Sequence, residues 1–224
     1  MSDAVVLVVS DVHKSYPSPA GSLKVLGGVT LEVSQGERVA IQGASGSGKS
    51  TLLYVVGGLA KPDSGTIVIG GRSVGELSKG ALSNFRRTQI GIIFQRSNLL
   101  SGLDLTENVL LPLRLNGVSG KAALEQADNA LRRVGLAPRV NHRVSELSEG
   151  EKQRGAIARA LVHRPAVLLA DEPTGSLDPS NRRVVLDVFD SLEEVTLVIV
   201  THDDEVAARC RTRYALSEGI LRRL

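Results

Sequence analysis

The segment Gly43–Thr51, GASGSGKST, carries the residue types that bind a polyphosphate. Its glycines let the backbone adopt positive φ angles and approach anionic oxygens closely, so that loop and helix N–H groups point at the phosphates. We expect Lys49 to neutralise the β- and γ-phosphates and the Ser50 hydroxyl to bind Mg²⁺. Residues 38–42 resemble a buried strand and residues 51–56 a helix, which is the setting this motif requires. A nucleotide site is therefore predicted.

Two carboxylates, Asp171 and Glu172, end the apolar run 166–170. Such a run is typical of a strand buried on both faces of a parallel sheet, and ligands bind at the carboxyl ends of such strands. Asp171 is predicted to hold Mg²⁺ through its hydration shell, and Glu172 to accept a proton from an attacking water. Taken alone, two adjacent acids are more simply interpreted as a solvated strand end. The presence of the phosphate loop in the same chain favours the catalytic interpretation.

Two other polar residues follow apolar segments. His202 comes after residues 197–201 and is placed to hydrogen-bond a γ-phosphate and the attacking water. Gln95 comes after residues 90–94, where an amide can contact both Mg²⁺ and water. The histidines that lack such a setting, and that we expect at the surface or in packing positions, are His13, His142 and His163.

Residues 147–154, LSEGEKQR, predict the start of a helix that continues to about residue 162. Ser148 and Glu151 have the spacing of a capping box, in which each residue satisfies a backbone N–H group of the other. A capped helix N-terminus can also receive a phosphate, and this one is far in sequence from the phosphate loop.

The order of the predicted elements indicates the α/β class. Strand-like segments lie near residues 4–9, 23–34, 37–42, 66–70, 90–94, 166–171, 196–201 and 212–217, and helical periodicity covers residues 107–115 and 121–134. We predict one domain over residues 1–224, with a P-loop NTPase core of mixed β-sheet flanked by helices. Residues 1–95, which include an N-terminal antiparallel β lobe, and residues 160–224 would form this core. Residues 96–159 would form an inserted α-helical subdomain.

The composition is that of an ordinary soluble globular protein, with 42% hydrophobic residues, 23% charged residues and a net charge of +3. The charges are spread along the chain, so nucleic-acid binding is not indicated. The single cysteine, Cys210, excludes an internal disulfide framework and suits a reducing compartment. Residues 5–9 are too short for a signal peptide, and no apolar run approaches the roughly 20 residues that span a bilayer, so we expect any membrane role to come through a partner.

Together these motifs resemble those of the ABC ATPases, in the same order and over nearly the whole chain. GASGSGKST is similar to the Walker A motif, Gln95 to the Q-loop, LSEGEKQR to the signature motif, LLADEP to the Walker B motif, Gly175–Asp178 to the D-loop and His202 to the switch histidine. Tyr16 matches the aromatic residue that stacks on adenine, although from the residues alone it is a turn aromatic before Pro17. Within the family, ADEPTGSLD, residues 105–109, the GGLAKPDSG turn and the short length together resemble the branch that serves lipoprotein release, macrolide export and cell division.

The resemblance implies an ATPase that uses ATP and Mg²⁺ and forms a head-to-tail homodimer, with two ATP molecules between the phosphate loop of one subunit and the signature helix of the other. The implied catalytic residues are Lys49, Gln95, Glu172 and His202. The implied nucleotide contacts are Tyr16, Gly43, Ser45, Gly46, Ser47, Gly48, Lys49, Ser50, Thr51, Ser148 and Gly150, and the implied metal contacts are Ser50, Gln95 and Asp171.

A separate transmembrane permease is the implied partner, received by the surface around residues 96–109, which would hold the subunit at the cytoplasmic face of the membrane. Transport and force transmission without cargo both remain open. A soluble DNA-repair or translation role is disfavoured, because the chain shows no long coiled coil, zinc module or second cassette.

The signature motif departs from the usual LSGGQ or LSGGE at Glu149. A carboxylate there repels phosphate if it faces the nucleotide and has almost no effect if it points to solvent. We therefore expect hydrolysis to be retained, and to be slower in the first of these two orientations.

Overall fold

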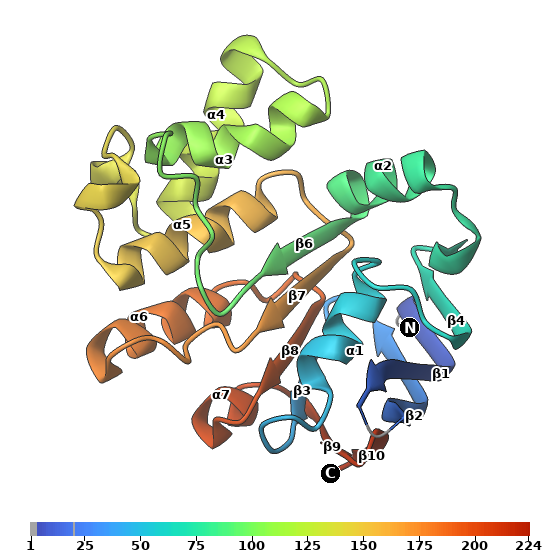
Figure 1. The fold of residues 1–224 in the computed structure, drawn as a ribbon. Coiled ribbons are helices and arrows are strands. Elements are labelled where there is room, and N and C mark those ends of the chain that lie inside the picture. Colours follow the sequence, from blue (N-terminus) through green and yellow to red (C-terminus); the bar gives the residue numbers. More distant parts are fainter. Residues whose placement is uncertain (1–3, 20) are drawn as a thin grey trace.

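The computed structural model describes residues 4–19 and 21–224 (Figure 1). In chain order its elements are β1 (Val5–Ser18), β2 (Gly21–Ser34), β3 (Arg38–Gln42), α1 (Lys49–Val56), β4 (Ser64–Ile69), β5 (Arg72–Ser73), η1 (Val74–Glu76), α2 (Lys79–Gln89), β6 (Ile90–Ile93), α3 (Leu105–Leu115), α4 (Gly120–Arg133), η2 (Ala137–Arg139), η3 (Val144–Glu146), α5 (Glu149–Leu161), β7 (Val167–Asp171), α6 (Pro179–Asp190), β8 (Leu197–Thr201), α7 (Asp204–Ala208), β9 (Thr212–Ser217) and β10 (Ile220–Arg223).

The strands form two sheets. A four-stranded antiparallel sheet has the order β2-β1-β4-β5, and a six-stranded sheet has the order β10-β9-β3-β8-β7-β6. Within the larger sheet β9, β3, β8, β7 and β6 are parallel, and only β10 is antiparallel to its neighbour. This confirms the predicted α/β class with an N-terminal antiparallel lobe.

The larger sheet is the central layer because its middle strands β3, β7 and β8 are buried on both faces. Side chains alternate across a strand, so Val39 and Ile41 join one buried cluster while Ala40, between them, joins the other. The first cluster includes α1 and the four-stranded sheet, and the second includes α3 to α6. Figure 1 shows these groups on opposite sides of the sheet. Every residue of β7 and β8 is buried, as expected for central parallel strands.

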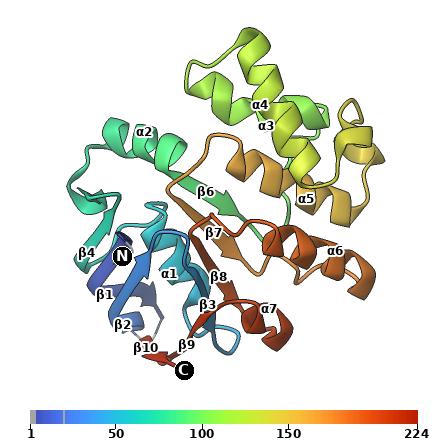
Figure 2. The ribbon, with the colours of Figure 1, turned by 180° about the vertical axis from the view of Figure 1, so that it is seen from behind.

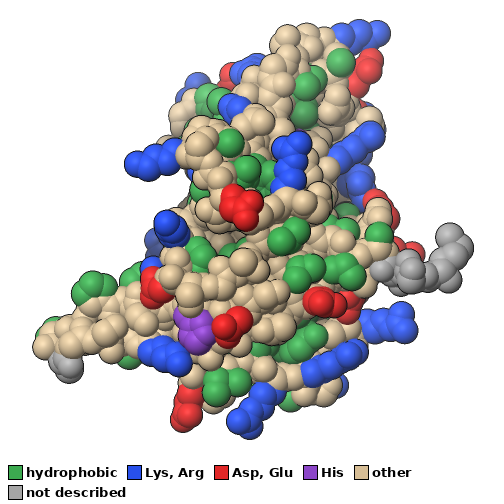
Figure 3. All heavy atoms as spheres, turned by 90° about the vertical axis from the view of Figure 1, so that its right-hand side faces the viewer, with side chains coloured by type: hydrophobic (Ala, Val, Ile, Leu, Met, Phe, Trp, Pro, Cys, Tyr) green, Lys and Arg blue, Asp and Glu red, His purple; other side chains and the backbone are tan. Residues whose placement is uncertain are grey.

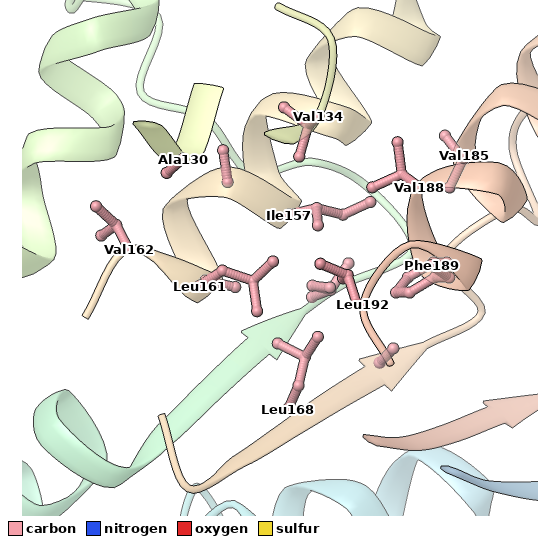
Figure 4. Close-up of a cluster of buried hydrophobic side chains, with 14 of the residues drawn as sticks. Ala130, Val134, Ile157, Leu161, Val162, Leu168, Val185, Val188, Phe189 and Leu192 are labelled. Carbon is pink, nitrogen blue, oxygen red and sulfur yellow. The ribbon is translucent and has the colours of Figure 1, made fainter. Parts of the chain in front are cut away.

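The helices α3, α4 and α5 pack against one another and against α6. Figures 1 and 2 both place α3 and α4 at the end of the molecule opposite β9 and β10. The small residues Ala123, Ala127 and Ala130 form the buried stripe of α4, at helical spacing. In Figure 4, Ile157 and Leu161 of α5 point toward the side chains of α6 and toward Leu168 of β7. The helical segments predicted for this region are therefore confirmed, whereas the division into core and subdomain stays a prediction.

The structure corrects one local expectation. From the residues alone Tyr16 is a turn aromatic, but β1 continues to Ser18 and Tyr16 is a strand residue paired with Leu23. Proline is tolerated at position 17 because β4 pairs with β1 only as far as His13, which leaves that side of β1 open.

Two further findings concern the outside of the molecule. Among the described residues, no helix combines the length and apolarity needed to cross a bilayer. On the face shown in Figure 3, acidic and basic side chains are interspersed with small hydrophobic areas.

Candidate functional site

The phosphate loop connects the end of β3 to the start of α1. Gly46 and Gly48 have φ angles of 81° and 101°, in the left-handed region that favours glycine. A Cβ atom at Gly48 would lie 2.9 Å from Val25, and one at Gly43 would lie 2.4 Å from the carbonyl oxygen of Leu216. Among the described residues, no side chain caps the first turn of α1. The loop is thus close-packed beneath, and its free N–H groups can receive an anion.

Lys49 is the first residue of α1 and is buried. Its Nζ donates to the backbone oxygens of Gly43 at 2.7 Å and Ala44 at 3.0 Å, and lies 3.9 Å from Oε1 of Glu172. The ammonium group is therefore held within the loop that it is expected to neutralise when phosphate binds.

Ser50 and Asp171 meet at the expected metal position. The Ser50 hydroxyl donates to Oδ1 of Asp171 at 3.0 Å. Burial raises the pKa of Asp171 above its ordinary value, and hydrogen bonds from Ser50 and Tyr54 oppose this shift. Among the described residues no three His, Cys, Asp or Glu side chains gather as a metal cluster. One hydroxyl and one carboxylate fit a Mg²⁺ ion whose other ligands are phosphate and water oxygens.

Glu172 is held at the end of β7 by the neighbouring strand. Its φ angle is 43°, which is uncommon for a residue other than glycine. Oε2 accepts from the Thr201 hydroxyl at 3.1 Å and from the His202 N–H group at 3.3 Å. Oε1 lies 2.8 Å from Nδ1 of His202, whose side chain is 66% exposed. The parallel register, with Asp171 opposite Val200, is what brings these residues together.

Gln95 follows β6 and approaches the same place from the other side. Its Nε2 lies 3.2 Å from the position of a Cβ atom at Gly175, and its backbone oxygen accepts from the Ser176 hydroxyl at 3.2 Å. A hollow of about 540 Å³ collects most of the predicted residues. Its lining residues are Val25, Ser45, Gly46, Gly48, Lys49, Ser50, Thr51, Gln95, Glu172 and His202.

The signature segment lies outside this hollow. Ser148 caps α5 by accepting from the Glu151 N–H group at 3.2 Å, and the Glu151 carboxylate accepts from the Ser148 N–H group at 2.9 Å. The predicted capping box is thus confirmed. Gly150 is buried, and a Cβ atom there would lie 2.1 Å from Oδ1 of Asn181. Within the described chain, neither Ser148 nor Gly150 lines the hollow that holds Lys49.

Glu149 points away from its own helix axis into solvent. Its side chain is 67% exposed, and its Oε1 accepts from Nζ of Lys152 at 2.7 Å. The carboxylate is therefore paired with a cation one turn along α5.

A family model described as "ABC transporter" matches residues 26–175. The chain belongs to this family. The ABC ATPase is 44% identical over 220 residues to the lipoprotein-releasing system ATP-binding protein LolD of Legionella pneumophila (strain Lens), with 97% of each chain covered. It is 45% identical over 212 residues to the LolD protein of Bdellovibrio bacteriovorus, which covers 93% of this chain and 96% of that one.

Solved structures agree with this assignment. The ABC ATPase superposes with a TM-score of 0.89 and 35% identity on the ATP-binding cassette MJ0796 in a dimeric post-hydrolysis state bound to ADP and Pi, with 97% of each chain covered. A second dimeric structure of MJ0796, a bacterial ABC transporter cassette, gives a TM-score of 0.88 at 36% identity. The predicted family, fold, ATP binding and ATPase activity are confirmed.

Two residues of this region, Thr201 and Tyr54, had no predicted role in the ABC ATPase. Thr201 is 1% exposed and hydrogen-bonds Glu172. Tyr54 of α1 hydrogen-bonds Asp171, and its ring lies 6.3 Å from that of Phe94, next to Gln95. Burial and the Asp171 carboxylate raise the pKa of the Tyr54 phenol. The position of Thr201, a polar residue at the end of an apolar strand, was the only sequence feature that could have indicated its role. No local sequence feature indicates the contact of Tyr54 with Asp171.

Proposed function

We propose that two copies of this ABC ATPase bind two ATP–Mg²⁺ head to tail, and that their closure and reopening drive a separate transmembrane permease. The separation of two half-sites within one chain carries this proposal. Lys49, Ser50, Gln95, Glu172 and His202 share one hollow, while the signature helix N-terminus lies elsewhere. Because each motif occurs once, a second copy must supply the missing half. The dimers of MJ0796 support this arrangement.

The residues of the hollow suit positioning and charge neutralisation, which dominate catalysis of phosphoryl transfer. In this mechanism Lys49 exchanges its bonds to the loop carbonyls for bonds to the β- and γ-phosphates. Glu172 accepts a proton from the attacking water, and His202 donates a hydrogen bond to the γ-phosphate. Ser50, Gln95 and, through the hydration shell, Asp171 would hold a Mg²⁺ ion, which would supply positive charge to neutralise the phosphates.

Contacts to the adenine base and contacts from the signature helix complete the proposed site. Tyr16 stacks on adenine, and Ser148 with the Gly150 backbone binds the γ-phosphate of the partner's ATP. The remaining contacts come from the phosphate loop, at Gly43, Ser45, Gly46, Ser47, Gly48 and Thr51. The surface around residues 96–109 receives the permease, which places the ATPase peripherally at the cytoplasmic face of the membrane. The relatives named as lipoprotein-releasing ATP-binding proteins support a permease of that type.

The test is the oligomeric state of the Glu172→Gln variant, measured by size-exclusion chromatography with light scattering. With ATP and Mg²⁺ we expect the mass to double, because binding closes the dimer and slow hydrolysis leaves it closed. The same variant without nucleotide, and wild type assayed for phosphate release, are the references. Glu172→Gln/Ser148→Arg is the matched control and should stay monomeric. A monomer of Glu172→Gln at saturating ATP and Mg²⁺ would contradict the sandwich dimer.

A further inference from the structure

The segment of β1 that carries Tyr16 is tied to the turn before β4. Oδ1 of Asp63 accepts from Nζ of Lys14 at 2.9 Å, and Oδ2 accepts from the backbone N–H group of Ser15 at 2.6 Å. The Asp63 N–H group in turn donates to the backbone oxygen of His13 at 2.9 Å. One aspartate thus holds both a side chain and the backbone of the residues just before Tyr16.

The turn itself is fixed against β1. Gly65 has a φ angle of 88°, and a Cβ atom there would lie 2.3 Å from the backbone oxygen of Asp11. Ser64 pairs with His13 across the strands. Beyond His13, β1 has no ladder partner in β4, so the Asp63 contacts replace the missing strand pairing on that side.

Lys14 connects this anchor to the aromatic ring. Its Nζ lies 5.2 Å from the centroid of the Tyr16 ring, within the range of a cation–π contact. The Lys14 side chain is only 16% exposed, whereas Tyr16 is 39% exposed. The hydrogen bond from Lys14, together with that from Ser15, holds the pKa of Asp63 below its ordinary value. The Asp63 carboxylate is therefore stabilised as an anion beside Lys14.

Strand pairing places Tyr16 on the side of the phosphate loop. Tyr16 lies opposite Leu23, and Val25 follows two residues further along β2, where the β1–β2 register shifts. Val25 in turn packs against Gly48 and lines the hollow. Tyr16 and Leu23 together expose an aromatic and an aliphatic surface near the phosphate loop, which is what a nucleobase requires.

We propose that Lys14 and Asp63 are positioning residues that hold the Tyr16 ring for stacking on the nucleobase. This rests on the proposed function, in which ATP occupies the hollow. Lys14 covers part of the Tyr16 ring, so the nucleobase stacks on the part of the ring that Lys14 leaves free. Asp63 keeps Lys14 and the Ser15 backbone in place. Loss of the pair loosens the base contact and leaves the phosphate contacts intact.

The experiment compares ATP with inorganic tripolyphosphate, which has the phosphates and no base, by isothermal titration calorimetry in the presence of Mg²⁺. We expect Asp63→Ala and Lys14→Met each to weaken ATP binding about fivefold, a part of what stacking on an aromatic residue contributes. Tripolyphosphate binding should stay unchanged. Lys14→Arg should restore ATP affinity, and Asp11→Ala, which removes another exposed acid from the same strand, should have no effect.

Tyr16→Ala separates the outcomes. It should weaken ATP binding at least as much as Asp63→Ala, and the double variant should be no weaker than Tyr16→Ala alone, because the pair acts through the ring. If Tyr16→Ala weakens ATP binding and neither Asp63→Ala nor Lys14→Met does, the positioning role is wrong while the nucleotide site stands. Equal weakening of ATP and tripolyphosphate would also overturn it, because the effect would then be on the phosphate loop. Dimerisation of Glu172→Gln with ATP tests the proposed function independently.

Discussion

The hollow around the phosphate loop (the phosphate side) and the start of α5 (the signature side) differ in which groups their polar side chains hydrogen-bond. On the phosphate side Ser50 and Glu172 hydrogen-bond to groups of other elements, and Lys49 hydrogen-bonds to its own loop and lies 3.9 Å from Glu172; all three are at least partly buried. On the signature side Ser148 and Glu151 bond only to each other's residues within one helix turn and to Arg139 nearby. The first half-site is therefore preorganised by contacts between elements, whereas the polar side chains at the start of α5 are held mainly by contacts within that region.

Removing Lys49 gives the largest expected effect on the preorganised side. Lys49→Ala should lower ATP hydrolysis by about 10²-fold or more, because one preorganised charge aimed at the reacting phosphate is lost. The melting temperature should change little, since the hydrogen bonds of Nζ are to carbonyl oxygens of its own loop and its ion pair with Glu172, at 3.9 Å, is long. Phosphate release and a thermal melt measure the two. Hydrolysis within tenfold of wild type would show that this side is less dependent on Lys49 than its geometry indicates.

The next largest effect is expected at Gly150, where the signature side does depend on another element. Gly150→Ala places a Cβ atom 2.1 Å from Oδ1 of Asn181, so α5 must move away from α6. We expect the free energy of unfolding to fall by about 1–3 kcal/mol, as for other overpacked sites, and ATP-dependent dimerisation to weaken. Urea denaturation measures the stability.

The control for Gly150→Ala is its combination with Asn181→Ala, which removes the two nearest clashing atoms, Oδ1 and Cγ, and leaves the Cβ atom at 2.8 Å. The double variant should recover part of the stability lost by Gly150→Ala. No recovery would mean that contact with Asn181 is not why glycine is needed at this position.

Thr201→Val tests the support of Glu172 and has a smaller expected effect. Valine keeps the shape of threonine and removes the donor to Oε2 of Glu172, so hydrolysis should fall about tenfold, near the lower value for a hydrogen bond to a charged group. The affinity for ATP should be unchanged, and Thr201→Ser should restore the rate. Steady-state phosphate release with a parallel binding titration separates the two. A change in affinity without a change in rate would place Thr201 outside the catalytic support.

The comparison also shows what could be read from the sequence. The central strands and the ends of β7 and β8 were predictable, because burial on both faces requires an apolar run and a parallel sheet brings the following polar residues to one edge. The capping box of α5 was predictable because both partners lie within four residues. Both inferences depend on local patterns only.

What the sequence could not give depends on long-range register. Thr201 and Glu172 meet because β7 and β8 are paired with Asp171 opposite Val200, a register that no local pattern specifies. The contact of Gly150 with Asn181 joins two helices, and glycine at that position was read only as a backbone contact to nucleotide. Pro17 suggested a turn, but β1 accepts a proline there because β4 does not pair with that part of the strand. The sequence of the segment does not show which strands lie beside it.

The smallest effect is expected at Glu149, the departure from the usual signature motif. Its carboxylate is 67% exposed and paired with Lys152 at 2.7 Å. This is the solvent-facing orientation, for which almost no effect on turnover is expected. Glu149→Gln should change hydrolysis by less than about twofold, as is usual for an exposed ion pair, and Lys152→Gln should slow it slightly more because it leaves the carboxylate uncompensated. Phosphate release at low and high ionic strength measures both, and the difference between them should vanish as salt screens the charge. A tenfold faster Glu149→Gln enzyme would show instead that the carboxylate turns toward the partner's phosphates in the closed dimer, so that the signature side is remodelled on closure and the contrast between the two half-sites holds only for the single chain.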